Sequence, residues 1–300
     1  MHDKKRLFAN LGLLLTAVIW GTGFSATQYA IDSGLSSALI LLLRFAVAAI
    51  ALGALCWKQV VAITGKEWLW GALSGLFLFL AFFFQTEAQG QTTPSNCAFL
   101  TTTNVLMVPF LIWAVRRKKP GLKNIVLPLL TVGGIFVLGY TPGEGIAFGM
   151  GDGLAIACAF FFACHIASLE FTSRQVEARK LTFIQMTTAA GLSLLYFLLA
   201  DRSPVTGGMM RSGILPVLYL GLFSTCACFF LQTAAQKHTT ATNAAIFLSM
   251  EGVFGSIFSV LLGLEPMRWT LAVGGTIIFL SVLLTEVEPP KRRLCNAKSE

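Results

Sequence analysis

The sequence predicts an all-α polytopic membrane protein with ten transmembrane helices, arranged as two inverted five-helix repeats. Three observations predict this fold: too few charged residues for a soluble surface, ten apolar windows of membrane-spanning length, and an internal repeat. Of the 300 residues, 55% are hydrophobic and only 12% are charged, and the mean hydropathy is +0.74. A soluble domain carries about 25% charged residues, so most of this surface must face something other than water.

The ten windows are read as helices because each is long enough and none alternates. A helix needs about 20 mostly apolar residues to cross a hydrocarbon core, whereas the strands of a membrane barrel are about ten residues long and alternate. Inside a bilayer the backbone N–H and C=O groups must be hydrogen-bonded within a helix or a closed barrel, and these windows fit only the helix. The first half contributes 9–29, 36–56, 68–88, 93–114 and 122–140, and the second half contributes 152–172, 181–200, 213–235, 240–263 and 267–285.

The basic residues set the expected orientation. With the N-terminus in the cytoplasm, 18 of the 22 Lys and Arg fall on the cytoplasmic side, among them the run 116–119. The opposite face receives Arg202, Arg211 and Lys237, and Arg44 lies within a helix. This bias follows the positive-inside rule, so we expect an integral protein of the inner, cytoplasmic membrane with both termini cytoplasmic. Basic loops facing anionic lipid then explain the formal net charge of +8 without a nucleic-acid partner.

Part of the chain occurs twice. Residues 82–104 recur at 229–251 without a gap, at a constant offset of 147. The identical pairs include Phe82 and Phe229, Phe83 and Phe230, Gln85 and Gln232, Ala88 and Ala235, Thr92 and Thr239, Thr93 and Thr240, Asn96 and Asn243, and Ala98 and Ala245. In addition, Trp20-Gly21 falls opposite Phe162-Ala163. We therefore divide the chain into two repeats at 1–148 and 149–300, with the glycine-rich stretch 149–153 as the turn between them.

Five segments per repeat is an odd number, so the second repeat starts on the opposite side of the membrane. Halves related in this way can rock around a site near the midplane, which is the arrangement of alternating-access transporters. The pattern therefore favours a secondary transporter, although this step from architecture to function is an analogy. We expect the substrate between the halves, near the first, second, third, fourth, sixth, eighth and ninth segments.

Several short motifs carry a family resemblance. They are Trp20-Gly21-Thr22-Gly23-Phe24, Leu43-Arg44-Phe45, Gly151-Asp152, Gln232 with Gln236-Lys237, and the stretch from Glu251 to Gly263-Leu264-Glu265. In order and spacing they resemble the drug/metabolite transporter superfamily, EamA type, over nearly the whole chain. The resemblance implies ten helices and transport of small metabolites, often export of amino acids or related compounds. The chain departs from the family pattern at Glu251-Gly252, where the family usually has Glu-Pro.

Two charged residues lie near the middle of predicted helices. A charge at that depth costs about 2.5–3.5 kcal/mol on insertion scales, so it needs a partner or a function. Arg44 and Glu251 could hold the carboxylate and amino ends of a zwitterion, and Glu251 could bind a coupling proton. The alternative is that they pair with each other, or with backbone carbonyls, and fasten the helices together.

Polar residues are also spaced four apart along the fourth and ninth segments. Thr92, Asn96 and Asn104 share one face of the fourth segment, and Asn243 and Glu251 share one face of the ninth. We expect each stripe to run from the outer end of its helix to the middle, lining a pathway or forming interhelical hydrogen bonds. The first repeat carries Asn104 where the second carries Glu251, so the halves are not chemically equivalent.

The remaining site candidates are single residues. Gln85 and Gln232 place amides near the ends of the third and eighth segments, and Trp20 and Thr22 lie in the glycine-containing motif of the first. His165 is a candidate proton carrier, with packing in an apolar helix as the alternative. We expect no metal site, because the seven cysteines have no zinc-type spacing.

No phosphate loop, His-Glu-x-x-His or Gly-x-Ser-x-Gly motif occurs in the sequence. We therefore expect no enzymatic activity, no catalytic residue and no cofactor, and we expect a small-molecule substrate and membrane lipid as partners. We predict a secondary transporter that exports small organic metabolites, such as amino acids or related compounds, by alternating access and with proton coupling through Glu251. An uncoupled facilitator is the alternative, and a membrane-embedded enzyme acting on a lipid-linked substrate ranks below it.

Overall fold

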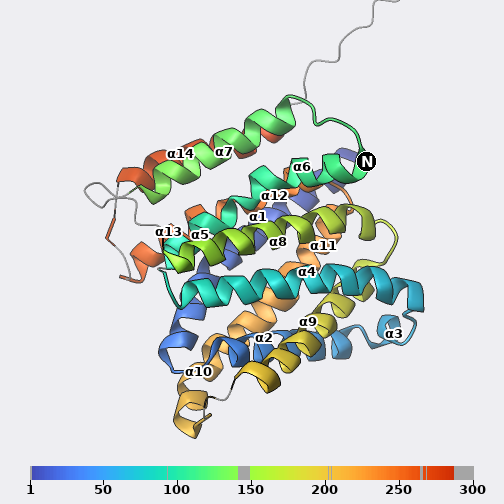
Figure 1. Ribbon diagram of the computed structural model, residues 1–300. Helices are drawn as coiled ribbons and strands as arrows, with labels where there is room; N and C mark the ends of the chain where they lie inside the picture. Colours follow the sequence, from blue (N-terminus) through green and yellow to red (C-terminus); the bar gives the residue numbers. More distant parts are fainter. Residues whose placement is uncertain are drawn as a thin grey trace, which may run out of the picture.

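The computed structural model describes residues 2–92, 94–140, 149–201, 203, 205–263, 266–267 and 269–286. All regular secondary structure within these residues is helical, so the predicted all-α fold is confirmed. The helices lie side by side in one bundle and run in the same general direction across the view of Figure 1. The C-terminal tail, with its Lys291, Arg292 and Arg293, lies outside the described residues.

The elements follow the predicted segments closely, with two of the segments interrupted and a third containing a π-helical stretch. The first half consists of α1 (His2–Asp32), α2 (Ser37–Leu55), α3 (Trp57–Val60), α4 (Gly65–Gln89), α5 (Pro94–Thr102), α6 (Asn104–Arg116) and α7 (Lys123–Gly139). The second half consists of α8 (Met150–Thr172), α9 (Ala178–Ala200), α10 (Gly207–Tyr219), the π-helical stretch η1 (Leu220–Ala227), α11 (Cys228–Gln236), α12 (Ala241–Leu248), α13 (Met250–Leu261) and α14 (Trp269–Glu286).

Eight helices or helix runs of the described chain are long and apolar enough to cross a membrane. The fourth and ninth segments count among them as the runs Asn96–Arg116 and Ala241–Leu261. The fifth and tenth segments are shorter apolar helices, Lys123–Val137 and Ala272–Leu284. Eight crossings therefore follow from length and composition, and the count of ten remains a prediction.

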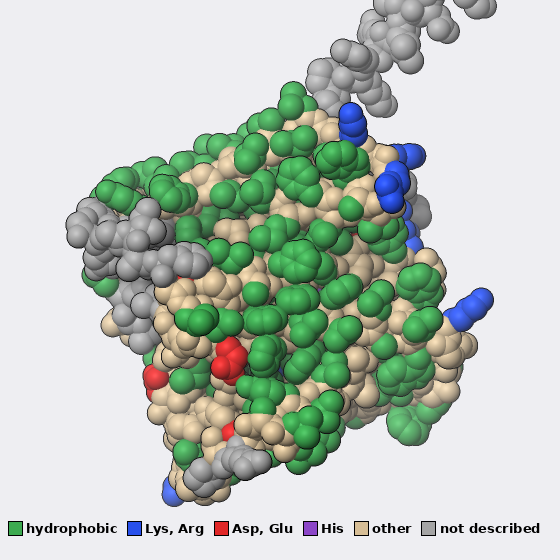
Figure 2. All heavy atoms as spheres, in the orientation of Figure 1, with side chains coloured by type: hydrophobic (Ala, Val, Ile, Leu, Met, Phe, Trp, Pro, Cys, Tyr) green, Lys and Arg blue, Asp and Glu red, His purple; other side chains and the backbone are tan. Residues whose placement is uncertain are grey.

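The two ends of the bundle differ in charge. Figure 2 shows a mostly hydrophobic face, with Lys and Arg gathered mainly at the edge where Figure 1 marks the N-terminus and acidic groups toward the opposite edge. We call these the basic end and the far end. We expected Lys237 on the far face. It lies shortly before Ala241, whose backbone N–H donates to Glu170. Glu170 also forms an ion pair with Arg116 of the basic run, which places Lys237 at the basic end. The expectation was wrong because the eighth segment ends where the fourth and sixth also end.

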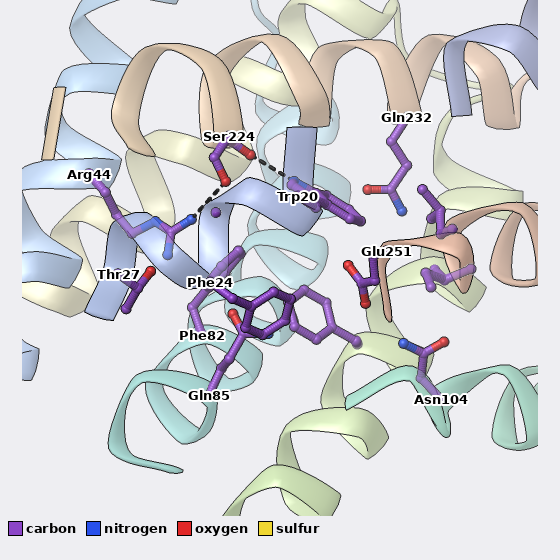
Figure 3. Close-up of a pocket in the computed structure, with 14 residues that line it drawn as sticks. Trp20, Phe24, Thr27, Arg44, Phe82, Gln85, Asn104, Ser224, Gln232 and Glu251 are labelled. Atoms are coloured by element: carbon purple, nitrogen blue, oxygen red, sulfur yellow. Dashed lines mark hydrogen bonds between the residues drawn. The ribbon is translucent and has the colours of Figure 1, made fainter. Parts of the chain in front are cut away.

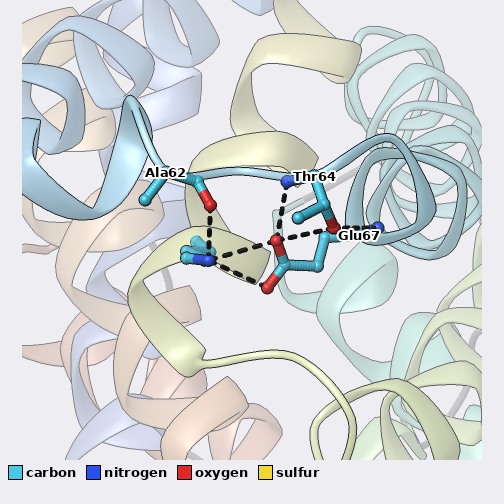
Figure 4. A network of polar contacts seen from close by, with 4 residues as sticks. Ala62, Thr64 and Glu67 are labelled. Atoms are coloured by element: carbon cyan, nitrogen blue, oxygen red, sulfur yellow. Dashed lines mark hydrogen bonds and ion pairs between the residues drawn. The ribbon is translucent and has the colours of Figure 1, made fainter.

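Small residues bring the helices of the two halves into contact. A Cβ atom at Gly71 of α4 would lie 2.6 Å from the side chain of Ile184, and one at Gly75 would lie 2.8 Å from that of Thr188. Both neighbours belong to α9, so the two glycines set the close approach of α4 and α9. At the basic end, Lys180 of α9 binds Glu67 of α4 at 3.0 Å, where Glu67 also closes the capping box with Thr64 (Figure 4).

The centre of the bundle is built from contacts between the halves. Helix α4 packs on α8, α1 packs on η1, α11 and α13, α2 packs on α9, and α7 packs on α14. The stretch 149–153 was expected to be a turn, but α8 already begins at Met150 with Gly149 as its N-cap. That correction follows from Asp152, whose carboxylate accepts the Gly149 N–H at 2.9 Å and so caps the helix.

Candidate functional site

A pocket lies at the centre of the bundle, between helices of both halves (Figure 3). It contains about 500 Å³ of space between the lining atoms, counting the part open at its mouth. The lining residues are Trp20, Gly23, Phe24, Thr27, Arg44, Phe82, Gln85, Asn104, Phe162, Ile166, Ser224, Gln232, Leu248 and Glu251. They come from the seven segments between which the sequence predicts the substrate.

Four aromatic rings meet beside the pocket. The ring centroids of Trp20 and Phe229 lie 5.0 Å apart, those of Phe82 and Phe162 lie 5.1 Å apart, and those of Phe82 and Phe229 lie 5.7 Å apart. Trp20 is fixed further by its indole N–H, which donates to the carbonyl oxygen of Ser224 at 2.8 Å. The cluster gives the pocket a rigid apolar wall from both halves of the chain.

The glycine beside Trp20 determines where this wall stands. A Cβ atom at Gly21 would lie 2.7 Å from Cβ of Phe254 and 2.8 Å from the backbone nitrogen of Gly255. Any larger residue would push α1 away from α13, which carries Glu251. The glycine-containing motif of α1 therefore serves close packing around the pocket.

Arg44 enters the pocket from α2 with only 2% of its surface exposed. Its Nε donates to Oγ1 of Thr225 at 3.1 Å and its Nη2 to Oγ of Ser224 at 3.5 Å. The guanidinium carbon lies 4.0 Å from the ring centroid of Phe82, a cation–π contact. No carboxylate of the described residues forms an ion pair with Arg44, so its charge is held by hydroxyls and an aromatic ring alone.

The hydroxyls that hold Arg44 belong to η1. A π-helical turn is rare and is found frequently at functional sites. Here it places the successive residues Ser224 and Thr225 toward the same guanidinium, while the Ser224 carbonyl receives Trp20. The irregular turn, which belongs to the second half, thus holds Trp20 and Arg44 of the first half in position.

Glu251 lies on the other side of the pocket from Arg44, next to Gln232 and Asn104 in Figure 3. It is 6% exposed and has no hydrogen bond or ion pair with any described residue. Gln232 donates from Nε2 to Gln236 at 3.0 Å, which leaves its Oε1 buried without a partner among the described residues. Buried polar atoms are ordinarily paired, so these groups are free to receive a polar solute.

Asn104 and Glu251 share a second feature, because each follows an interruption of its helix. The fourth segment breaks between α5 and α6 at Thr103, and the ninth breaks between α12 and α13 at Ser249. The hydroxyl of Thr103 donates to the Leu100 carbonyl at 2.6 Å, and the hydroxyl of Ser249 donates to the Ile246 carbonyl at 2.6 Å. Such bonds compete with the helical ladder. Interrupted helices at mid-depth are typical of transporter sites.

Six of the ten sequence-predicted site residues therefore come together around one pocket. They are Trp20, Arg44, Gln85, Asn104, Gln232 and Glu251. The other four make contacts elsewhere. Thr22 donates to the Ile19 carbonyl at 2.8 Å and also bonds the Tyr219 hydroxyl, and His165 is buried with its Nε2 2.7 Å from Oε1 of Gln185.

Asn96 and Asn243 occupy the starts of the interrupted segments, away from the pocket. Asn96 donates to Asp152 and, at 2.9 Å, to Thr92. The backbone N–H of Asn243 is received by the Thr240 hydroxyl at 3.2 Å, which caps α12. Since α12 starts at the basic end, the second polar stripe runs inward from that end. The expectation that both stripes start at the outer end was wrong.

Sequence reasoning did not select Thr27, Ser224 or Phe162 as site residues. Phe162 had a usable signal, because it falls opposite Trp20 in the repeat. Ser224 had none, since the π-helical turn that aims it at the pocket depends on contacts with α1 and α2.

One pair of hydrogen bonds occurs in both halves and fixes two pocket-lining residues. Gln89 donates from Nε2 to the Phe24 carbonyl at 2.6 Å, and Gln236 donates from Nε2 to the Ile166 carbonyl at 2.9 Å. Gln236 follows Gln89 at the same offset of 147 that relates the repeated stretches, and Phe24 and Ile166 each lie four residues after Trp20 and Phe162. The two halves therefore hold their pocket walls by the same device.

Comparisons with known proteins agree with this architecture. The sequence profile of the EamA-like transporter family matches twice, at residues 7–140 and 149–287. Two proteins of Archaeoglobus fulgidus, each described as an uncharacterized transporter, are similar over nearly the whole chain. One is 31% identical over 284 residues, which is 94% of this chain and 87% of that protein, and the other is 25% identical over 295 residues, which is 95% and 98%.

A solved protein structure also superposes on the chain with a TM-score of 0.75 at 20% sequence identity. The match covers 93% of this chain and 96% of that one. At this identity the likeness concerns the fold alone.

Proposed function

Given that this chain belongs to the EamA-like transporter family, we propose that it is a secondary transporter that exports a small organic zwitterion, such as an amino acid or a related metabolite. Membership makes the protein an integral membrane transporter of small molecules. The zwitterionic substrate, the direction and the coupling described below are our proposal.

One observation carries the choice of substrate. The pocket presents an uncompensated cation, Arg44, and an uncompensated carboxyl group, Glu251, on opposite sides of one space. A solute with a carboxylate and an ammonium group supplies both missing partners at once. The amides of Gln85 and Asn104 and the Oε1 atom of Gln232 add hydrogen bonds. The aromatic wall receives the apolar part of the solute.

Alternating access is proposed from the way the halves meet. The family profile matches each half separately, and equivalent segments of the two halves, such as α2 with α9 and α7 with α14, pack against each other. These observations support two inverted repeats, 1–148 and 149–300, with five helices each. The shorter helices α7 and α14 then complete the ten crossings, and the basic end faces the cytoplasm of the inner membrane.

Proton coupling is proposed from the position of Glu251. The carboxyl group lies in the same pocket as the substrate and has no internal partner, so a proton and the substrate ammonium compete for it. Inward movement of a proton would then drive outward movement of the substrate. A facilitator without ion coupling would use the same pocket and is the alternative outcome.

Solute counterflow in proteoliposomes tests the substrate class. Vesicles are loaded with an unlabelled amino acid, and uptake of labelled zwitterion is compared with that of the matching amine without its carboxylate and the matching acid without its amine. We expect the zwitterion to exchange at least about tenfold faster than either analogue, since each analogue leaves one buried charge unpaired. Equal exchange of the three compounds would contradict the proposed recognition.

A further inference from the structure

Helix α8 carries a buried carboxylate at each end, and neither belongs to the pocket. At the far end, Asp152 is 8% exposed and accepts hydrogen bonds from the Asn96 amide and, at 3.3 Å, from the Thr92 hydroxyl. The start of α8 packs tightly against the loop between α4 and α5, because a Cβ atom at Gly151 would lie 3.0 Å from the backbone of Gln91. We call the group formed by Asp152, Asn96 and Thr92 the far clasp.

At the basic end, Glu170 is 4% exposed and bonds two elements at once. Its Oε1 lies 2.6 Å from Nη2 of Arg116, at the end of α6, and its Oε2 accepts the Ala241 N–H at 2.8 Å, at the start of α12. A carboxylate at a helix N-terminus also interacts favourably with the helix dipole. We call the group formed by Glu170, Arg116 and the Ala241 N–H the basic clasp.

Both clasps join α8 to the same partner, the interrupted fourth segment. Asn96 lies in α5 and Arg116 ends α6, and the interruption between them leads to Asn104 in the pocket. On the α8 side, Phe162 and Ile166 line the same pocket between the two clasps. The two segments are therefore fastened at both ends with the site between, and separating them at either end requires the clasp at that end to break.

Resting on the proposed function as an alternating-access transporter, we propose that Asp152 and Glu170 are its two gating residues. The far clasp closes the pocket toward the far side and the basic clasp closes it toward the basic side. Only one opens at a time during transport. Both clasps are formed in this structure.

A second pair of ties between the halves provides matched controls. Helices α4 and α9 are also joined at both ends, by Glu67 with Lys180 at the basic end and by the Tyr196 hydroxyl donating to Glu87 at 3.0 Å at the far end. These ties resemble the clasps in chemistry and location along the bundle. No residue of α9 lines the pocket, however, so breaking them opens no route to it.

The test measures from which side the pocket is reached. A cysteine is introduced at Leu248, an apolar lining residue, and its reaction with a membrane-impermeant maleimide is followed in vesicles of each orientation against the chain without Leu248→Cys. Asp152→Asn keeps one oxygen that can accept the Gly149 N–H. Its new NH₂ group takes the place of the oxygen that accepts from the Asn96 amide, so that hydrogen bond is lost. Glu170→Gln keeps the bond to Ala241 but loses the charge that binds Arg116.

We expect Asp152→Asn to raise labelling from the far side about tenfold and Glu170→Gln to raise labelling from the basic side about tenfold, as loss of one charged hydrogen bond predicts for a two-state equilibrium. Glu87→Gln and Glu67→Gln should stay within about twofold of the parent, since their ties lie off the pocket. Unchanged labelling in both clasp variants, opening toward the same side, or equal effects in the controls would each overturn the proposal.

Two further measurements keep the result interpretable. If Asp152→Asn fails to fold, Asn96→Ala removes the same bond without touching the cap of α8, and Arg116→Gln does so for the basic clasp. Counterflow is measured on the same preparations. Sided labelling without transport of any solute supports the gates and contradicts the proposed function, whereas normal transport with unaltered labelling contradicts the gates alone.

Discussion

The first half of the chain gives the pocket Arg44 and Asn104, and the second half gives it Gln232 and Glu251, although both halves are folded from the same pattern. Aligning Ala48-Ala49 with Ala189-Ala190 places Arg44 opposite Gln185. Gln185 does not line the pocket and instead bonds His165 at 2.7 Å. By contrast, Gln89 and Gln236 are identical and make the same bond to a pocket-wall carbonyl.

This difference separates two kinds of residue. The matched pair Gln89 and Gln236 holds the wall. At the positions of Arg44 and Glu251 the halves differ, and one half alone places a charge in the pocket. One half supplies the cation and the other the carboxyl group, so the proposed zwitterion would contact both halves. That requirement links substrate binding to the relative movement of the halves.

Replacing the unmatched cation should have the largest effect. Arg44→Gln gives the first half the residue of the second, and we expect transport of the zwitterion to fall about 100-fold, because its carboxylate loses a desolvated charge partner. Counterflow measures this loss, with Arg174→Gln, an exposed arginine at the basic end, as the control. Retention of more than about a third of the wild-type rate would remove Arg44 from substrate recognition.

The matched glutamines should give smaller effects, on stability. Gln89→Leu leaves a pocket-wall carbonyl without its side-chain donor and should lower the free energy of unfolding by about 1 kcal/mol. Gln236→Leu should cost about twice as much, because it also removes the acceptor of the Gln232 amide. Thermal unfolding in detergent measures both, and Gln91→Leu at an exposed position should change little. No loss at either glutamine would show that these bonds do not hold the pocket wall.

The smallest effect is expected at the caps of α2 and α9. Ser36 caps α2 and its hydroxyl also donates to Asp201, whereas Glu177 at the corresponding position makes no side-chain cap bond on α9. Burial raises the pKa of Asp201, but hydrogen bonds from Ser36 and the Ser203 N–H outweigh it, so the pKa lies below its usual value. A lowered pKa in the folded state stabilises the fold above the unfolded pKa, and this stability is lost as pH falls.

Ser36→Ala should therefore destabilise the protein by less than about 1 kcal/mol at pH 7, and by a smaller amount below about pH 4. Thermal unfolding of both proteins at the two pH values measures the difference. An effect of equal size at both would mean that the cap bond alone matters and that Asp201 contributes nothing.

Much of the fold could be predicted from the sequence, because runs of apolar residues show the helix lengths and matching residues show the repeat. Every expected segment overlaps observed helices. Trp20, Arg44 and Glu251 stand out because motifs or isolated charges mark them. The π-helical turn that aims Ser224 and the breaks at Thr103 and Ser249 could not be predicted. They depend on which carbonyl a hydroxyl reaches once neighbouring helices are packed.

The roles proposed for Asp152 and Glu170 could not be predicted from the sequence either. Both are visible as acidic residues near the ends of a predicted helix, where a charge is ordinary. Their significance comes from Asn96 and from Arg116 and Ala241, which are distant in sequence and come close only in the folded bundle. Thr22 was selected for its motif, but its hydroxyl faces Ile19 and Tyr219 and not the pocket.

The central claim is that Glu251 couples substrate movement to protons. It is tested most directly by following the internal pH of proteoliposomes while the zwitterion that exchanges fastest in counterflow is added outside. The wild-type protein should move protons outward as the zwitterion enters, as should the control Glu177→Gln at an exposed position. Glu251→Gln should still exchange zwitterion, more slowly because the ammonium loses its charge partner, and should move no protons. Proton movement by this variant at the wild-type ratio of protons to zwitterion would contradict the account.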